Sequence, residues 1–304
     1  MIHKTSPIVL FVFNRPWHTR QTIEALHNNA LASQSDLIIF SDGVRDDRDL
    51  SPVFEVRNYV RSIKGFRSLE IVEKPENQGL ANSIINGVSS VIDRYGRAIV
   101  LEDDIVTSPY FLSYMNAALD FYEETERVFT VCGYNHPPEL LKIPRHYTHD
   151  VFFTYRNSSW GWATWKNRWL KADWQVSDYF SFKGSVATRK SFDRSGSDLS
   201  DMLIAQMEGQ IDSWAIRWTY SHFVHNSLAL WPIRSFVNNI GHDNTGIHSR
   251  RTTIYCNDLS RTKKDPKLPP VPFVDEQLLK NFARVYKRGP LTRFKKFLVG
   301  MGNK

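Results

Sequence analysis

The feature that most constrains this chain is an alternation of short apolar runs and amphipathic stretches over its first 135 residues. The first run, residues 8–13, is uninterrupted, which is typical of a strand buried on both faces. Strands that alternate with helices favour βαβ units. The sequence therefore predicts an α/β fold with a mostly parallel, Rossmann-like sheet flanked by helices. The predicted strands are residues 8–13, 37–40, 69–72 and 98–101, and the predicted helices begin at Pro16, span 53–63 and follow Asn77-Gln78-Gly79.

Beyond about residue 150 this alternation ends. Five of the nine tryptophans fall between residues 160 and 174, and Trp165 and Trp169 have a helical spacing that favours core packing. Residues 175–200 are predicted to be a polar loop region. We expect one domain over 1–255, with halves 1–135 and 136–255, and then a linker and tail over 256–304. Further expected elements are strands at 151–153 and 228–233, helices after Ser108-Pro109 and at 212–226, and a proline-rich surface linker at 263–272.

The net charge of the chain is carried by one end of it. The 39 Lys and Arg exceed the 32 Asp and Glu, for a formal charge of +7, but residues 280–304 hold eight basic residues and no acid. The rest is close to neutral, which excludes a protein that coats phosphates generally, and no nucleic-acid partner is expected. In a helix after Pro290, Leu291, Phe294 and Leu298 would fall near one face, which favours contact with an anionic membrane surface. The alternative is a terminal helix docked on the body.

Two cysteines are too few for a disulfide framework, which favours a reducing compartment. The sequence has no signal-peptide pattern and no apolar run long enough to span a bilayer. We therefore expect a cytoplasmic protein, with the tail placing it at the inner face of the cell membrane. The sequence contains no Walker-type phosphate loop, no G-x-G-x-x-G after the first strand, no G-x-S-x-G elbow and no paired-cysteine zinc motif.

Three consecutive acids follow the predicted strand at 98–101, namely Glu102, Asp103 and Asp104. Ligands of open α/β sheets bind outside the carboxyl ends of the strands. Three adjacent carboxylates stay ionised only beside a cation or hydrogen-bond donors, and a divalent ion that also binds substrate phosphates suits such a place. The alternative is a solvated acidic turn.

Two other strand ends carry polar residues suited to a nucleotide. Asn14 and Arg15 follow the first strand, and an arginine there can pair with a diphosphate or stack on a base. Asp42 follows the second strand and can accept a hydrogen bond from a base or a ribose. Each alone is an ordinary turn residue, but together with the three acids they place candidates at three strand ends on one edge.

The order Asn14-Arg15, Ser41-Asp42-Gly43, Asn77-Gln78-Gly79 and then Val-Leu-Glu-Asp-Asp-Ile-Val-Thr-Ser-Pro-Tyr-Phe from residue 100 resembles a nucleotide-sugar glycosyltransferase of the GT-A fold. The likeness is to bacterial sugar transferases related to N-acetylglucosaminyltransferase I, and it spans roughly residues 7–250. It implies a nucleotide-binding half over 1–135 and an acceptor half over 136–255. It also implies a metal-dependent, inverting transfer from a UDP-sugar such as UDP-GlcNAc to a glycan or lipid-linked acceptor in cell-surface polysaccharide synthesis, with Mn²⁺ or Mg²⁺ as cofactor.

Carried over by position, the resemblance assigns a role to each candidate. Asp212, in Ile-Asp-Ser-Trp, lies where the family has adjacent aspartates, one of them the general base; here the second is Ser213. The segment from Pro232 to Ser249 resembles a loop that closes over the donor. The donor-binding candidates are Asn14, Arg15, Asp42, Asn77, Glu102 and Asp103; the sugar and acceptor candidates are Trp160, Gly161, Trp162 and Asp243; and the metal candidates are Asp104 and His248.

Inverting transfer needs a carboxylate to accept the proton of the acceptor hydroxyl and a cation to offset charge on the leaving diphosphate. Asp212 suits the first task, although it equally suits the N-cap of the predicted helix, and Asp243 competes with it. Flat indole rings pack well on sugar C–H faces, which favours Trp160 and Trp162. Two other functions stay open: a sugar-phosphate nucleotidyltransferase, and a non-catalytic glycan-binding module of the same fold.

Overall fold

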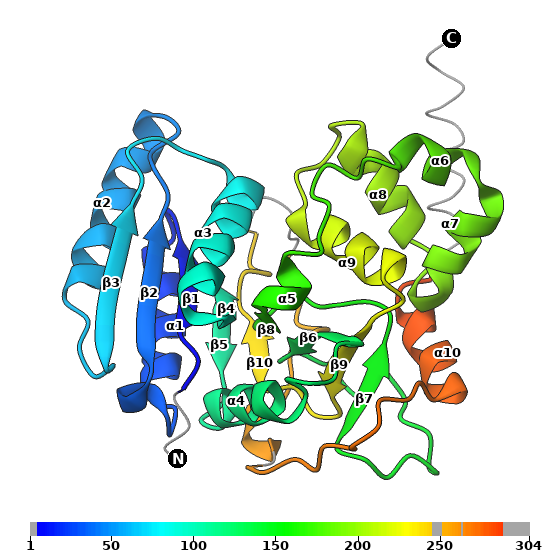
Figure 1. Ribbon diagram of the computed structural model, residues 1–304. Coiled ribbons are helices and arrows are strands. Elements are labelled where there is room, and N and C mark those ends of the chain that lie inside the picture. Colours follow the sequence, from blue (N-terminus) through cyan, green and yellow to red (C-terminus); the bar gives the residue numbers. More distant parts are fainter. Residues whose placement is uncertain (1–4, 245–250, 263, 288–304) are drawn as a thin grey trace.

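The computed structural model describes residues 5–244, 251–262 and 264–287 (Figure 1). Eight strands form one sheet in the order β3-β2-β1-β4-β8-β6-β9-β7, and two short strands, β5 and β10, pair separately. The strands are β1 (Ile8–Val12), β2 (Asp36–Ser41), β3 (Ser68–Glu73), β4 (Arg97–Glu102), β5 (Ile105–Thr107), β6 (Val128–Cys132), β7 (Val151–Thr154), β8 (Trp162–Trp165), β9 (Leu228–Pro232) and β10 (Val237–Asn239).

The first four strands of the sheet are all parallel, which confirms the predicted α/β class. In β1, Ile8, Leu10 and Val12 face one apolar cluster while Val9 and Phe11 face another. The strand is therefore buried on both faces, as its uninterrupted apolar run predicts. Helices cover both faces of the sheet: α1, α2, α4 and α10 contribute to one cluster, and α3, α5 and α9 to the other.

The helices are α1 (Pro16–His27), α2 (Asp47–Arg61), α3 (Leu80–Tyr95), α4 (Phe111–Phe121), α5 (Lys166–Trp169), α6 (Tyr179–Gly184), α7 (Val186–Phe192), α8 (Leu199–Met207), α9 (Trp214–Val224) and α10 (Glu276–Val285). Side-chain caps set the first residue of several helices. The Asp46 carboxylate accepts a hydrogen bond from the backbone amide of Arg48 and caps α2. The helix therefore begins at Asp47, six residues before the predicted start at 53. The Ser213 hydroxyl caps α9, so Asp212 is not its N-cap. Short 3₁₀ helices are η1 (Ala32–Gln34), η2 (Asp193–Ser195) and η3 (Leu259–Arg261).

The second half of the sheet is mixed, because β8 runs antiparallel to both β4 and β6, and β7 runs antiparallel to β9. Strands β5, β6, β8 and β10 were not among the predicted elements. Trp165 ends β8 and Trp169 ends α5, and both rings are buried, which confirms that they pack in the core although they do not share a helix.

The predicted polar loop at 175–200 is wrong. It contains α6, α7, η2 and the start of α8, which close over a third apolar cluster with Val176, Phe182 and Phe192 at its centre. The apolar residues that build this cluster are spaced too irregularly for one long helix, so the periodicity of the segment is weak.

The end of the described chain belongs to the body rather than to a separate tail. Helix α10 buries Leu278 and Phe282 against the sheet, and the Tyr122 hydroxyl donates to the carbonyl of Pro269 at 2.8 Å. The predicted linker over 263–272 therefore leads to a docked helix. The predicted amphipathic helix after Pro290 lies outside the described residues. Within the described part of the chain, no helix is long and apolar enough to cross a membrane.

Candidate functional site

The carboxyl ends of β2, β1 and β4 lie side by side along one edge of the sheet, since these strands are parallel neighbours. Asp42, Asn14-Arg15 and Glu102–Asp104 therefore leave the sheet at that edge, as the sequence predicts. Within it, their side chains divide into an acid cluster around Arg15 and a loop cluster around Asp42.

The acid cluster is built on Arg15, which precedes the first turn of α1. Its Nε donates to Asp103 Oδ2 at 3.3 Å, and its Nη2 donates to both Asp103 Oδ1 and Asp104 Oδ2, the latter at 2.9 Å. The Thr22 hydroxyl of α1 donates to the carbonyl of Asp103 at 2.8 Å and fixes the end of β4 against the helix. One guanidinium thus bridges two of the three consecutive acids.

Residues 239–243, here called the roof segment, cover this cluster. The Asn239 amide donates to Asp104 Oδ1 at 3.3 Å, and the backbone amide of Ile240 donates to the carbonyl of Asp104 at 2.9 Å. A Cβ added to Gly241 would lie 2.2 Å from Asp104 Oδ2, so only glycine allows this close approach.

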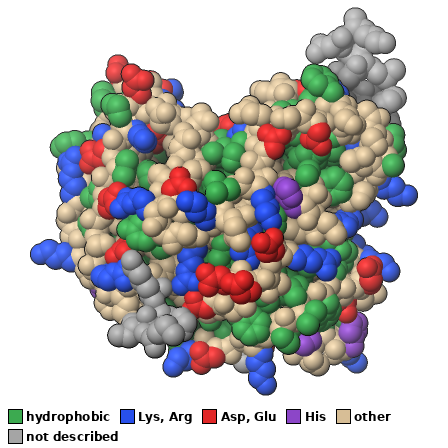
Figure 2. Space-filling model, in the orientation of Figure 1, with side chains coloured by type: hydrophobic (Ala, Val, Ile, Leu, Met, Phe, Trp, Pro, Cys, Tyr) green, Lys and Arg blue, Asp and Glu red, His purple; other side chains and the backbone are tan. Residues whose placement is uncertain are grey.

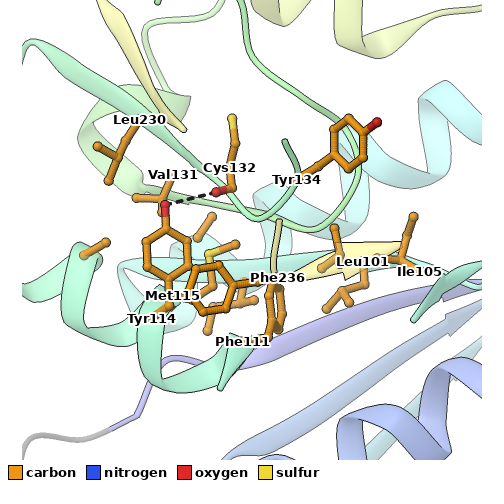
Figure 3. Close-up of a cluster of buried hydrophobic side chains, with 14 of the residues drawn as sticks. Leu101, Ile105, Phe111, Tyr114, Met115, Val131, Cys132, Tyr134, Leu230 and Phe236 are labelled. Atoms are coloured by element: carbon orange, nitrogen blue, oxygen red, sulfur yellow. Dashed lines mark hydrogen bonds between the residues drawn. The ribbon is translucent and has the colours of Figure 1, made fainter. Parts of the chain in front are cut away.

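The roof segment is held in place by the pairing of β10 with β5, which follows the acids directly. Below it lies an apolar core in which Phe236 stacks on Tyr114 with ring centroids 4.4 Å apart, and Tyr114 donates to the carbonyl of Cys132 at 3.1 Å (Figure 3). The core therefore fixes both the acids and the segment that covers them.

The roof segment also contacts α1. His18 Nε2 lies 3.1 Å from Asp243 Oδ2, and the His18 ring is nearly buried. Asp243 thus contacts the helix that begins at Arg15, next to the acid cluster. His248, the predicted second metal ligand, lies outside the described residues.

The electrostatics of the acid cluster follow from burial and charge crowding. Burial, reinforced by Asp104 and Asp103, raises the pKa of Glu102 to about 8. Burial also raises the pKa of Asp103 to about 6, although Arg15 opposes the shift. Burial alone would lower the pKa of Arg15, but the two aspartates outweigh it and raise that pKa. Among the described residues, three acids thus crowd around one arginine.

The loop cluster lies at the end of β2. Asp42 Oδ1 accepts from the backbone amides of Gly43 and Gln78 at 2.9 and 2.8 Å, and Oδ2 accepts from that of Gly79 at 3.2 Å. The Asn77 amide donates to the carbonyl of Gly43 at 2.9 Å. Asp42 and Asn77 therefore hold the turn that leads into α3.

Asp212 reaches the same turn from the second half of the chain. Its Oδ2 lies 3.7 Å from the position of a Cβ added to Gly79, and its side chain is exposed. Its carboxylate makes no hydrogen bond to the residues that the structure describes. Figure 2 shows a hollow in the upper outline of the molecule between α2 and β3 on one side and α6 and α8 on the other, and α3 and α9 begin beside it (Figure 1).

Asn14 turns away from the acid cluster. Its amide donates to Asp49 Oδ1 at 2.5 Å, and Arg45 Nε donates to Asp49 Oδ2 at 2.9 Å. These residues, with Asp46 and Arg48, line an open polar hollow of about 410 Å³ at the start of α2.

The predicted sugar-binding segment is only partly placed for that role. The Trp160 ring is half-buried and contacts Tyr134 and His242, with centroids 4.4 and 5.2 Å away. Trp162 is fully buried between Trp169 and Trp214, and Gly161 is buried against Phe111 and Val237. A sugar cannot reach either one here, so the predictions for Trp162 and Gly161 are wrong and Trp160 stays a prediction.

The acid cluster suits a cation that takes most of its ligands from substrate phosphates and water. Among the described residues, no three His, Cys, Asp or Glu side chains converge as a ready-made metal site. Mg²⁺ and similar ions commonly bind through one or two carboxylates together with substrate phosphates and water, and Asp104 with Asp103 offers such oxygens. The fit requires that Arg15 release them.

Sequence reasoning missed His18, Asn239 and Gly241. His18 lies three residues after Arg15, one helical turn along α1, and that spacing could have indicated it. Asn239 and Gly241 contact Asp104 across more than 130 residues of sequence, through a strand pairing for which no local pattern exists.

No protein-family model and no curated protein matches this sequence. Among solved structures, a mannosyltransferase from Pyrobaculum calidifontis in complex with GDP-Man and Mn²⁺ is similar at 12% identity and TM-score 0.38, over 54% of this chain and 46% of its own. S. aureus TarS is similar at 12% identity and TM-score 0.32, over 51% of this chain and 28% of its own. A UDP-glucose pyrophosphorylase complexed with UDP-glucose is similar at 10% identity and TM-score 0.37, over 74% of this chain and 89% of its own.

The chain thus spans less than half the length of the first two proteins. Similarities this weak identify neither a family nor a substrate. The function has to be inferred from the chain's own site.

Proposed function

We propose that this chain is a glycosyltransferase that moves a sugar from a nucleotide diphosphate-sugar, with a UDP-sugar such as UDP-GlcNAc as donor. One observation carries the proposal: Arg15 bridges Asp103 and Asp104 at the carboxyl edge of a parallel sheet, under a glycine-containing roof segment. Guanidinium and carboxylates side by side are the two kinds of group that a diphosphate with its cation requires.

In this proposal the donor lies along the strand ends. The Arg15 guanidinium would donate to the diphosphate, and Asp104 would hold a divalent cation, Mn²⁺ or Mg²⁺, to offset charge on the leaving diphosphate. Asn14, Asp42 and Asn77 lie on the uridine side, and Glu102 and Asp103 lie by the ribose and the sugar. Trp160 offers a partly exposed ring to a sugar face.

The base for an inverting transfer is proposed to be Asp212. The acceptor oxygen bonds to the anomeric carbon, the bond from that carbon to the diphosphate oxygen breaks, and UDP leaves with the electron pair. Asp212 accepts the hydroxyl proton. Its carboxylate is exposed and is not used to cap α9, whereas Asp243 is bound to His18. These contacts favour Asp212 over Asp243.

The acceptor is proposed to be a glycan or a lipid-linked saccharide of bacterial cell-surface polysaccharide synthesis, reached at the inner face of the membrane. The basic composition of residues 288–304 supports this setting, since Lys and Arg near an anionic surface each contribute about 1 kcal/mol.

UDP release from a panel of UDP-sugars, with Mn²⁺ or with a chelator, tests the proposal. We expect release from one donor with metal, and a loss on the order of 100-fold for Asp104→Asn. The control is Asp93→Asn, which removes an exposed carboxylate that pairs with Lys166 at 2.8 Å. Full activity of Asp104→Asn would contradict the metal assignment.

The same assay separates the other two functions. Pyrophosphate release from UTP and a sugar phosphate would indicate a nucleotidyltransferase. Binding of a glycan without UDP release from any donor, unaffected by Asp212→Asn, would indicate a non-catalytic module.

A further inference from the structure

We propose that Arg15 is an internal counter-cation that occupies the place of the metal ion until the donor arrives, so that a divalent cation and a nucleotide diphosphate each raise the affinity of this chain for the other. This proposal rests on the proposed function. It adds that the binding of the cation and the binding of the diphosphate are coupled through Arg15. It assigns to Arg15 two alternative sets of acceptors.

Both oxygens of Asp104 already accept a hydrogen bond. Oδ2 accepts from Arg15 at 2.9 Å and Oδ1 accepts from Asn239 at 3.3 Å. Asp103 is occupied as well, because Arg15 donates to both of its oxygens. A cation that approaches these carboxylates therefore competes with the guanidinium for their oxygens.

Little room is left around Arg15. A Cβ on Gly241 would lie 2.2 Å from Asp104 Oδ2 and 2.9 Å from Arg15 Nη1, so the roof segment packs directly on this ion pair. Only about a fifth of the Arg15 side chain is exposed. This packing disfavours a hydrated divalent ion beside the guanidinium, because such an ion gives up its water reluctantly.

A bound diphosphate would offer Arg15 another set of hydrogen-bond acceptors. Within the described residues, Asp103 and Asp104 are the only groups that accept hydrogen bonds from its side chain. A diphosphate offers the same forked acceptor geometry to a guanidinium. When Arg15 turns to the phosphates, it frees the carboxylates for the cation, and the cation in turn offsets the added negative charge.

Each ligand thus helps the other to bind. A cation alone must compete with Arg15. A diphosphate alone must face three acids and, within the described residues, share Arg15 with them. Reciprocal coupling between the two ligands follows from thermodynamic linkage.

Mn²⁺ binding, measured by the loss of the free-ion electron paramagnetic resonance signal, tests this inference with and without UDP. We expect wild type to bind Mn²⁺ at least about tenfold more tightly with UDP than alone. Arg15→Gln should bind Mn²⁺ alone about tenfold more tightly than wild type, because the competing cation is gone, and should show less coupling to UDP. A second change, Asp104→Asn, should remove that gain and so locate the ion.

Arg94→Gln is the matched control, because it removes an arginine that donates to Glu70 through two bonds of 2.9 Å. It should bind Mn²⁺ as wild type does. If Arg15→Gln fails to fold, Arg15→Lys tests the counter-cation role instead. A single ammonium cannot bridge both carboxylates in the same fork, so a smaller gain in Mn²⁺ affinity is expected.

Two negative results can be told apart. If UDP promotes Mn²⁺ binding but Arg15→Gln and Arg15→Lys bind Mn²⁺ alone no better than wild type, the counter-cation role is wrong and the proposed function stands. If calorimetry finds no binding of UDP or of any UDP-sugar by wild type in the presence of Mn²⁺, both fall.

Discussion

The carboxylates at the sheet edge are held by two different kinds of donor. Backbone amides hold Asp42, whereas a guanidinium holds Asp103 and Asp104. The first arrangement is local and fixes a turn; the second is a charge pair that a ligand can exchange. The sequence predicted that these residues share an edge, but it did not separate structural from exchangeable carboxylates, because that depends on partners from other elements.

At Asp42 we expect substitution to affect stability. Each Asp42 oxygen accepts a hydrogen bond from a backbone amide, and Asp42→Asn replaces one of these oxygens with an NH₂ donor. The amide of Gln78 or of Gly79 then loses its acceptor. The expected loss in the free energy of unfolding is about 1–3 kcal/mol. Urea unfolding measures it, with Asp93→Asn as an exposed control; equal stability of the two variants would contradict the structural role.

At the scale of elements, α10 is fastened to the body by a set of aromatic and charged contacts. The Phe282 ring lies 4.9 Å from that of Trp231, and the Tyr286 hydroxyl lies 2.8 Å from His136 Nε2. Arg156 lies over the Tyr286 ring, 3.6 Å from its centroid, and donates both ends of its fork to Asp198 at 2.7 and 3.0 Å. This helix is part of the fold rather than an appendage.

Phe282→Ala should therefore cost about 3–5 kcal/mol in the free energy of unfolding, because it opens a cavity under α10. Phe180→Ala is a matched control: the Phe180 side chain in α6 is 84% exposed, and its removal should change stability by less than about 0.5 kcal/mol. Urea unfolding of both variants checks the contrast, and similar losses would contradict the packing of α10.

The same contact set makes stability depend on pH. Burial, with a smaller contribution from Arg156, lowers the pKa of His136 to about 4, below the ordinary histidine pKa of about 6.5. The unfolded chain therefore binds a proton that the folded chain does not between these values, so stability is present above pH 6.5 and is lost as the pH falls toward 4.

In a His136→Gln variant this loss should be missing. The stability advantage of wild type over the variant should shrink by about 2 kcal/mol between pH 7.5 and pH 5. Chemical unfolding at the two pH values measures the difference, and an advantage that stays constant would show that His136 does not titrate as the structure implies.

Element prediction succeeded where burial on both faces leaves an uninterrupted apolar run, as in β1 and β4. It failed for β5 and β10, which have three residues each and gain their stability by pairing with each other. It also failed for α6 and α7, whose six and seven residues are too few to show a helical period.

At the scale of the whole molecule, the sequence predicted the α/β class and the sheet edge on which the acids lie. It could not predict that residues 239–243 return to cover Asp104, or that Trp162 packs inside a tryptophan cluster, because both depend on long-range topology. Residues 288–304, which follow the last described helix in the sequence, carry five Lys and Arg and no acid.

Two truncations separate the body from the basic end. A chain ending at Lys287 should keep the wild-type midpoint of unfolding and UDP binding but lose binding to vesicles that contain anionic lipid, measured by co-sedimentation. A chain ending at Pro272 removes α10 and should be strongly destabilised. Vesicle binding that survives in the 1–287 chain would contradict the membrane role of the basic end.

The central claim is that the edge around Arg15 and Asp104 binds a nucleotide diphosphate-sugar with a divalent cation. The most direct test is a thermal-shift panel of nucleotide-sugars, with and without Mn²⁺, on wild type and on Asp104→Asn. We expect one UDP-sugar with Mn²⁺ to raise the unfolding temperature of wild type by several degrees, because a ligand that binds only the native state stabilises it, and to leave Asp104→Asn unchanged. Equal shifts in both proteins, or no shift with any nucleotide-sugar, would contradict the account.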